Sequence, residues 1–153
     1  MIPEFPEHLS DHVALLADSF TRLTGRRLLE NTDARELARR IWEAPFALVS
    51  HGAEADPVFN YANLTALRLF EMGWDAFTHL PSRLSAEPDK REARAALLQR
   101  VSEHGYIDDY AGVRISATGR RFVIRDAVVW NVIDRQGHCH GQAAMFARWS
   151  DAG

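Results

Sequence analysis

Two side chains able to act as a catalytic pair flank a predicted turn in the first half of the chain. His51 and Asp56 lie on either side of a segment that contains Gly52. An imidazole beside a carboxylate can act as a general base held by an orienting partner, as a hydrolase or an isomerase requires. Such an enzyme needs His51 or His79 next to a carboxylate inside a deep pocket. An exposed turn explains the same residues more simply, because Gly and Asp favour turns, and we predict no catalytic residues.

A second group of reactive side chains lies on a predicted strand near the C-terminus. His138 and His140 share one face of this strand and could supply two metal ligands, whereas Cys139 points to the other face. A closed zinc site requires about four ligands, so we predict a pair at a hairpin edge and no metal site. Asp108 and Asp109 are also neighbours on a predicted strand, and their carboxylates therefore face opposite ways and form no catalytic pair.

Length and composition limit the classes of protein to which the chain can belong. The 153 residues are 46% hydrophobic and 25% charged, which suits one folded domain with an extension and argues against disorder. The net charge of −3 and the lack of a basic run argue against a nucleic-acid surface. No apolar segment approaches the roughly 20 residues needed to cross a bilayer. The single cysteine, Cys139, excludes an internal disulfide and suits a reducing cytoplasm.

The N-terminal part of the chain predicts two helices. On the first, from Ser10 to about Thr24, apolar residues recur at the heptad-like positions Leu9, Val13, Leu16, Phe20 and Leu23. This seam is too short for a free coiled coil, so it must pack either on its own domain or on a second copy. The second helix begins after Asp33, and Pro45 ends it.

The clearest local signal is a strand that passes directly into a helix. After a first strand over residues 46–50, Phe59 and Tyr61 alternate with Asn60, as in a strand with one buried face. Asn63 then precedes three apolar residues with helical spacing, Leu64, Leu67 and Phe70. Asn is a favoured helix N-cap, and as a cap alone it could be replaced by Asp with little effect.

The second half of the chain predicts broken helices followed by sheet. Gly73 and Pro81 interrupt the helical pattern, and a longer helix begins at Pro88. Three strands joined by hairpin turns then cover residues 106–116, 121–133 and 138–149. Residues 127–133 are apolar on nearly both faces, so both faces of the sheet need cover. The broken helices supply one cover, and the N-terminal seam helix, from this chain or from a partner, supplies the other.

This order of elements is that of a PAS domain with an N-terminal helical extension. The segments FALVSHGAEADPVFNYANLTALRLFEMGWDAFTHLPSRLSAE, HGYIDDYAGVRISATGRRFVI, VVWNVID and HGQAAMF resemble MEKHLA-domain proteins of the bacterial type. That family is PAS-related and also occurs in certain plant homeodomain–leucine zipper regulators. The resemblance implies an α+β fold with a PAS-like five-stranded antiparallel sheet and crossing helices. It also implies a helical extension over residues 1–45 and a PAS-like domain over residues 46–150.

PAS domains bind ligands between the inner face of the sheet and the crossing helices. The resemblance therefore implies five candidate ligand-binding residues: Phe59, Tyr61, Phe77, Tyr110 and Trp130. Arg83, near the crossing helices, is the sixth candidate. Large aromatic residues at such places more often fill a core than line a cavity. Arg83 could hold an anionic ligand or simply pair with Glu87 or Asp75.

The resemblance leaves the cofactor unknown. The chain lacks the Asn-Cys-Arg-Phe-Leu type of string that flavin photoreceptors of this class carry. His104 is the one residue near the place of a haem ligand, and it lies at the end of a predicted helix. Gln142 corresponds to a flavin-contacting Gln of some PAS domains, but it is one residue out of register and should face outward. We predict a colourless protein.

Two classes of function follow from these patterns. The first is a sensory or regulatory module in the cytoplasm that binds a small molecule, a protein partner or both. We expect a homodimer through the N-terminal helix and the outer sheet face, and no nucleic-acid or membrane partner. The alternative is a small cytoplasmic hydrolase or isomerase that uses a pocket His with a carboxylate. A module that only dimerises is a third interpretation, which a filled core would favour.

Overall fold

The computed structural model describes residues 5–86 and 91–152 of the chain. The first half contains η1 (Glu7–Leu9), α1 (Ser10–Thr24), α2 (Ala34–Trp42), β1 (Ala47–His51), β2 (Phe59–Ala62), α3 (Leu64–Phe70), α4 (Trp74–Phe77) and η2 (Ser82–Ser85). The second half contains α5 (Arg91–His104), β3 (Tyr106–Ile115), β4 (Arg121–Ile133), β5 (Cys139–Phe146) and β6 (Arg148–Asp151). The predicted helix start at Pro88 lies outside the described residues, as does Glu87.

The described strands form one antiparallel sheet in the order β2-β1-β5-β4-β3, with β6 also paired to β4. The predicted α+β fold is confirmed, with six described strands where the sequence predicted five. The last predicted strand is divided, because β5 ends at Phe146 and β6 begins at Arg148. On β4, Asp126 has a left-handed backbone with φ of 54°. It falls between the stretch that pairs with β5 and the stretch that pairs with β6, and it interrupts the ladder there.

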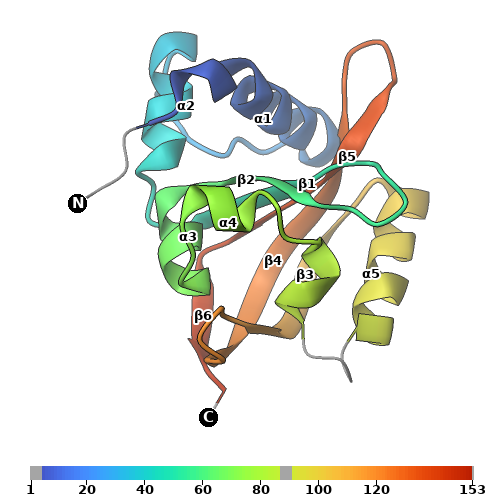
Figure 1. Ribbon diagram of the computed structural model, residues 1–153. Helices are drawn as coiled ribbons and strands as arrows, with labels where there is room; N and C mark the ends of the chain where they lie inside the picture. The colour runs from blue at the N-terminus through green and yellow to red at the C-terminus, as the bar shows by residue number, and fades with distance from the viewer. Residues whose placement is uncertain (1–4, 87–90, 153) are drawn as a thin grey trace.

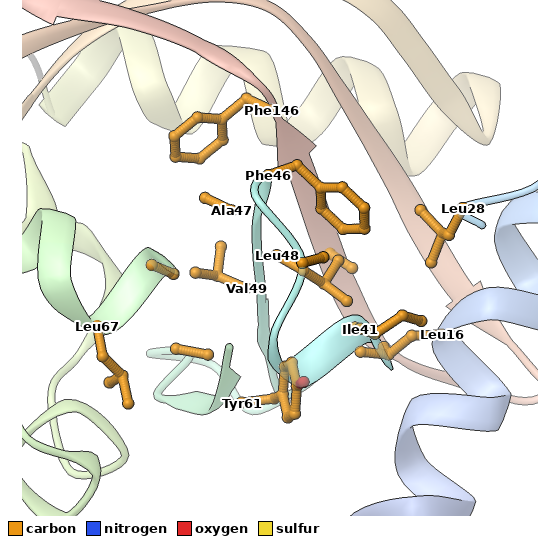
Figure 2. Close-up of a cluster of buried hydrophobic side chains, with 14 of the residues drawn as sticks. Leu16, Leu28, Ile41, Phe46, Ala47, Leu48, Val49, Tyr61, Leu67 and Phe146 are labelled. Atoms are coloured by element: carbon orange, nitrogen blue, oxygen red, sulfur yellow. The ribbon is translucent and has the colours of Figure 1, made fainter. Parts of the chain in front are cut away.

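Helices cover both faces of the sheet (Figure 1). We call the face that carries α3 and α5 the inner face, and the face that carries α1 and α2 the outer face. Figure 2 shows that β1 contributes to both: Leu48 points toward Leu16 and Ile41, whereas Ala47 and Val49 point toward the side of Leu67. Ala47, Leu48 and Val49 belong to β1, which is buried along its whole length. No helix in residues 5–86 and 91–152 combines the length and apolarity needed to cross a bilayer.

The outer face is covered by α1 of the same chain. Val13, Leu16 and Phe20 are fully buried, and the Phe20 ring meets Trp130 of β4 edge-on, with 4.9 Å between centroids. The hydroxyl of Ser19 donates to the carbonyl of Asn131 and accepts from the amide of Ile133, both on β4. The seam therefore packs within its own domain. The predicted homodimer remains a prediction, but it cannot use these buried side chains of α1. The division of the chain at residue 45 remains a prediction too.

The junction between β2 and α3 depends on the fully buried side chain of Asn63. Its Oδ1 accepts from the Ala66 amide, which confirms the predicted N-cap, and also from the Leu48 amide of β1, at 3.2 and 3.0 Å. Its Nδ2 donates to the carbonyls of Ile41 and Phe46, each at 2.9 Å. The side chain thus joins the end of α2, the start of β1 and the first turn of α3. A carboxylate could not replace it, because it has no donor for the two carbonyls.

We predict that Asn63→Ala and Asn63→Asp each lower the free energy of unfolding by at least about 3 kcal/mol, because each leaves buried polar groups unpaired. The matched control is Asp33→Ala. Asp33 is the exposed cap of α2 and accepts one cap hydrogen bond, from the Glu36 amide, so its loss should cost about 1 kcal/mol. Denaturant titrations of the three variants measure these values. A nearly neutral Asn63→Asp would show that the amide donors have no structural role.

We also predict that the double variant Leu16→Glu, Phe20→Glu fails to fold, because it places two carboxylates in the dry contact between α1 and the sheet. Ala14→Glu is the control, since Ala14 is exposed on the same helix. Circular dichroism and light scattering distinguish the outcomes. A double variant that stays folded as a monomer would instead assign this surface to a contact between two copies.

Candidate functional site

A cavity of about 50 Å³ lies between the inner face of the sheet and α5. Its apolar wall is formed by Phe59, Phe70, Leu97, Ile124, Val129 and Phe146. Its polar groups come from His51, Ser85, Arg94, Tyr110, Arg114 and Gln142. A space of this size holds on the order of four water-sized groups. In this arrangement the space is too small for a flavin or a haem.

The cavity adjoins a groove on the molecular surface. This groove has a volume of about 540 Å³ and runs between α5 and the β1–β2 loop, residues 52–57. Four residues line both spaces: His51, Arg94, Leu98 and Gln142. These side chains form the boundary that a molecule would pass when it moves from the groove to the cavity.

Arg94 is a buried cation at this boundary. Only 9% of the residue is exposed, and its Nη2 donates to the Ser82 hydroxyl at 2.8 Å. Burial, with a smaller contribution from the charge of Arg114, lowers the pKa of the Arg94 guanidinium to about 10, and Tyr110 opposes this shift. Among the described residues, no acidic side chain forms an ion pair with Arg94. Buried charges usually have a partner of opposite sign, and this one faces a second cation.

The second cation is placed by a row of residues on β3. Tyr110, Gly112 and Arg114 follow one another on the inner face, and the Arg114 guanidinium carbon lies 5.3 Å from the centroid of the Tyr110 ring. The ring extends across Gly112, where a Cβ would overlap the Tyr110 hydroxyl. Glycine at this position therefore lets Tyr110 lie flat along the strand. The ring in turn holds Arg114 at the cavity by a cation–π contact.

His51 completes the polar group of the cavity. Its Nδ1 donates to the Gly52 carbonyl at 2.9 Å, and its Nε2 is buried without a partner among the described residues. Burial lowers the pKa of the His51 imidazole, assisted by the charge of Arg94. The β5 backbone approaches His51 at Gly141, which has φ of 134° and where any Cβ would overlap the His51 carbonyl oxygen. Any other residue at 141 would push β5 away from the site.

The His–carboxylate pairs proposed from the sequence are not assembled. Asp56 forms an ion pair with Arg83 at 3.1 Å, and both side chains are about half exposed. No carboxylate among the described residues accepts a hydrogen bond from His51. His79 donates from Nδ1 to the backbone carbonyl of Asp75 and is exposed. Among the described residues, neither His51 nor His79 is hydrogen-bonded to a carboxylate, so the predicted pair of base and orienting group is not formed in the cavity.

The structure places the six predicted ligand-binding residues in four different environments. Phe59 and Tyr110 line the cavity. Phe77 lies behind Phe59, with stacked rings 4.2 Å apart. Arg83 lines the outer groove and holds Asp56 there, so its predicted pairing with Asp75 is replaced. The remaining two residues, Tyr61 and Trp130, lie on the outer face.

The outer position of Tyr61 and Trp130 corrects the prediction, and each has a physical reason. Between Ser50 and His51 the β1–β2 register shifts, so that Ser50 pairs with Tyr61 while His51 pairs with Phe59. This bulge turns Tyr61 away from the face of Phe59, despite the spacing of two residues. Trp130 belongs to the stretch of β4 that is apolar on both faces, where the pattern cannot assign a side. It contacts α1, and its neighbour Val129 lines the cavity.

The prediction that Gln142 faces outward was also wrong. Its Nε2 donates to the Leu98 carbonyl, the Ser102 hydroxyl and Asn131 Oδ1, at 3.1 to 3.2 Å. Sequence reasoning also missed Arg94. One signal could have found it, because Arg94, Leu97 and Val101 have the spacing of one helix face. A lone charged residue in such a face is the pattern of a buried cation.

His138 and His140 both contact Asp134 at the hairpin between β4 and β5. Asp134 Oδ2 lies 2.9 Å from His140 Nε2 and 3.5 Å from His138 Nδ1. The His140 hydrogen bond is the largest of several that lower the pKa of Asp134 to about 2. Across the described ranges, no group of three His, Cys, Asp or Glu residues has the arrangement of a metal site.

Comparison with known proteins identifies the family. The MEKHLA domain family model matches residues 10–151. The chain belongs to the MEKHLA domain family. It is 29% identical over 97% of its length to the homeobox-leucine zipper protein ATHB-14 of Arabidopsis thaliana, and 29% identical over 98% to HOX10 of Oryza sativa subsp. japonica. The chain spans 18% of the length of these relatives. They are plant proteins, so the bacterial branch of this MEKHLA domain remains a prediction.

Solved structures confirm the PAS fold of the MEKHLA domain. The PAS domain of a protein from Colwellia psychrerythraea superimposes with a TM-score of 0.62 and 12% identity, covering 76% of this chain and 94% of that one. The fungal blue-light photoreceptor Vivid, in its light-state dimer, gives a TM-score of 0.63 and 14% identity, with 88% and 92% covered. At this level of identity the likeness concerns the fold.

The two buried imidazoles predict a pH dependence of stability. Burial lowers the pKa of His51 and of His12, whose Nε2 lies 3.0 Å from the Ser50 hydroxyl. Between these lowered values and the ordinary 6.5, the unfolded chain binds more protons than the folded one. The two imidazoles therefore contribute fully to stability above the unfolded pKa. This contribution is lost as the pH falls from the unfolded pKa to the lowered pKa of the folded state.

We expect the denaturant midpoint of the wild type to decrease as the pH is lowered from about 7.5 to about 5.5. His12→Gln with His51→Gln should flatten this profile, whereas His8→Gln, at an exposed position, should leave it unchanged. Urea titrations across the pH range measure the effect. A profile that keeps its slope in the double variant would locate the titrating groups elsewhere.

Proposed function

We propose that this MEKHLA domain is a sensory or regulatory module that binds a small molecule in the cavity between the sheet and α5. The observation that carries the proposal is an internal cavity that meets a surface groove at four shared residues, His51, Arg94, Leu98 and Gln142. Interiors of proteins are usually close-packed, so an internal space is unusual in a purely structural core. A cavity that carries polar groups and adjoins an open groove therefore favours a binding role. The PAS and photoreceptor neighbours support a sensory role by analogy of fold.

α5 is the element best suited to report an occupied cavity. Its buried apolar residues, Leu97 and Val101, form a small cluster with Val129, separate from the main core. α5 also accepts hydrogen bonds from the sheet. Asn131 Nδ2 donates to the Val101 carbonyl at 3.1 Å, and Gln142 Nε2 donates to the Leu98 carbonyl in the middle of the helix. Elements with few buried apolar contacts open at low cost in free energy. A molecule in the cavity would therefore alter the stability or position of α5 before it alters the rest of the fold.

The proposal includes a location in the cytoplasm and a homodimer. The exposed free cysteine, Cys139, suits a reducing compartment. Any homodimer must use residues other than the buried side of α1, because Val13, Leu16 and Phe20 are fully covered within the chain. Light scattering of the wild type at several concentrations tests this part: a dimer has twice the chain mass of 17.3 kDa, and a constant 17.3 kDa would contradict it.

The binding proposal is tested with a panel of small anionic, cationic and neutral organic molecules, followed by two-dimensional NMR of the full chain. At least one member should shift amides of β5 and α5 and raise the hydrogen-exchange protection of α5. Ala144→Leu fills the cavity, since Ala144 is part of its wall, and should abolish the shifts. Ala96→Leu, on the exposed side of α5, should keep them. If no molecule shifts these amides, or if Ala144→Leu leaves binding intact, the proposal is wrong.

A further inference from the structure

Among the described residues, three basic side chains and no acidic one line the cavity. Arg94 and Arg114 both line it, and each acts electrostatically on the other. His51 lines it as well, with a buried Nε2 that lacks a partner among the described residues. The hydrogen bonds that the two guanidinium groups make go to neutral oxygens, namely the Ser82 hydroxyl and the Val113 carbonyl. The folded protein thus holds desolvated positive charge at a place where a ligand can enter.

We propose that the ligand is a small organic anion, a short-chain carboxylate whose charged end binds Arg94 and Arg114 and whose apolar end contacts the wall of the cavity. This inference rests on the proposed function and names the chemical class of the ligand. A guanidinium group matches a carboxylate with two parallel hydrogen bonds. Arg94 has one hydrogen bond among the described residues and therefore keeps donors for this purpose.

The apolar part of the wall favours a carboxylate over an inorganic anion. Phe70, Leu97, Ile124 and Val129 offer carbon surface that phosphate or sulfate could not use. Burying such surface against a short alkyl chain is favourable, because it removes apolar area from water. The volume of about 50 Å³ limits the ligand to a few non-hydrogen atoms. Propionate, with a carboxylate and two further carbons, is a suitable probe.

Buried Arg94 is also explained better by a ligand than by a structural role alone. A structural arginine in a core is normally held by a carboxylate or by several carbonyls. Some exposed cations in this chain do pair with carboxylates: Arg83 pairs with Asp56, and Arg135 pairs with Asp18. Arg94 is buried and has no such partner among the described residues. An anion from solution would supply the missing negative charge.

The test is a calorimetric or NMR titration of the full chain with sodium propionate, with propionamide as the neutral isostere. We expect propionate to bind at least tenfold more tightly than propionamide. Arg94→Gln should weaken propionate by about 10- to 100-fold, as the loss of a charge-assisted hydrogen-bonded pair predicts, and Arg94→Lys should weaken it less. Arg100→Gln, on the exposed side of the same helix, is the matched control and should bind like the wild type.

Several results would overturn the inference. Equal binding of propionamide, or an unchanged affinity in Arg94→Gln, would show that the charge is not recognised. A preference for inorganic phosphate would replace the carboxylate by another anion. If Arg94→Gln does not fold, Arg114→Gln tests the same contact from β3, at a less buried position. A neutral or cationic molecule that shifts the cavity amides would preserve the sensory proposal while refuting the anion, so the two failures are distinguishable.

Discussion

The fold of this chain depends on one buried amide. Asn63 makes four side-chain hydrogen bonds, to α2, β1 and the first turn of α3, and is fully buried. Because the amide carries donors and acceptors at fixed angles, it sets the direction of α3 relative to the sheet. It also fixes where α2 ends, and with it the aromatic group around Trp42 on the outer face.

The architecture was more predictable from the sequence than the site. Caps and periodicity depend on neighbouring residues, and both the Asn63 cap and the α1 seam follow from such local patterns. The orientation of Tyr61 depends on a register shift between two strands, which no single segment encodes. The side on which Trp130 lies could not be read from a strand that is apolar on both faces. Arg94 was missed because the face of α5 was assigned from its apolar residues alone, without the charged residue that shares this face.

The cavity of this PAS-like domain holds two neighbouring cations, Arg94 and Arg114. Arg94 has no carboxylate partner among the described residues, and its burial costs stability because desolvation disfavours its charged form. Tyr110 and Gly112 hold Arg114 nearby by geometry alone, through a ring that needs a residue without a side chain beneath it. The wall of the cavity comes partly from the main core, through Phe59, Phe70, Ile124 and Phe146. Leu97 of α5 and Val129 of β4, which also line it, belong to a separate small cluster. The cavity thus lies where the main core meets this smaller cluster.

The bulge at Ser50 and His51 has a further consequence for how such domains diverge. Two residues of β2 stand opposite one of β1 there, so Phe59 serves the inner face and Tyr61 the outer. Loss of Asn60 would restore regular pairing without moving either ring, because Tyr61 would still stand opposite Ser50 and Phe59 opposite His51. As direct neighbours the two rings would still face opposite sides of the sheet. One residue can therefore be gained or lost at this bulge while the phenol stays on the outer face and the phenyl ring stays at the cavity.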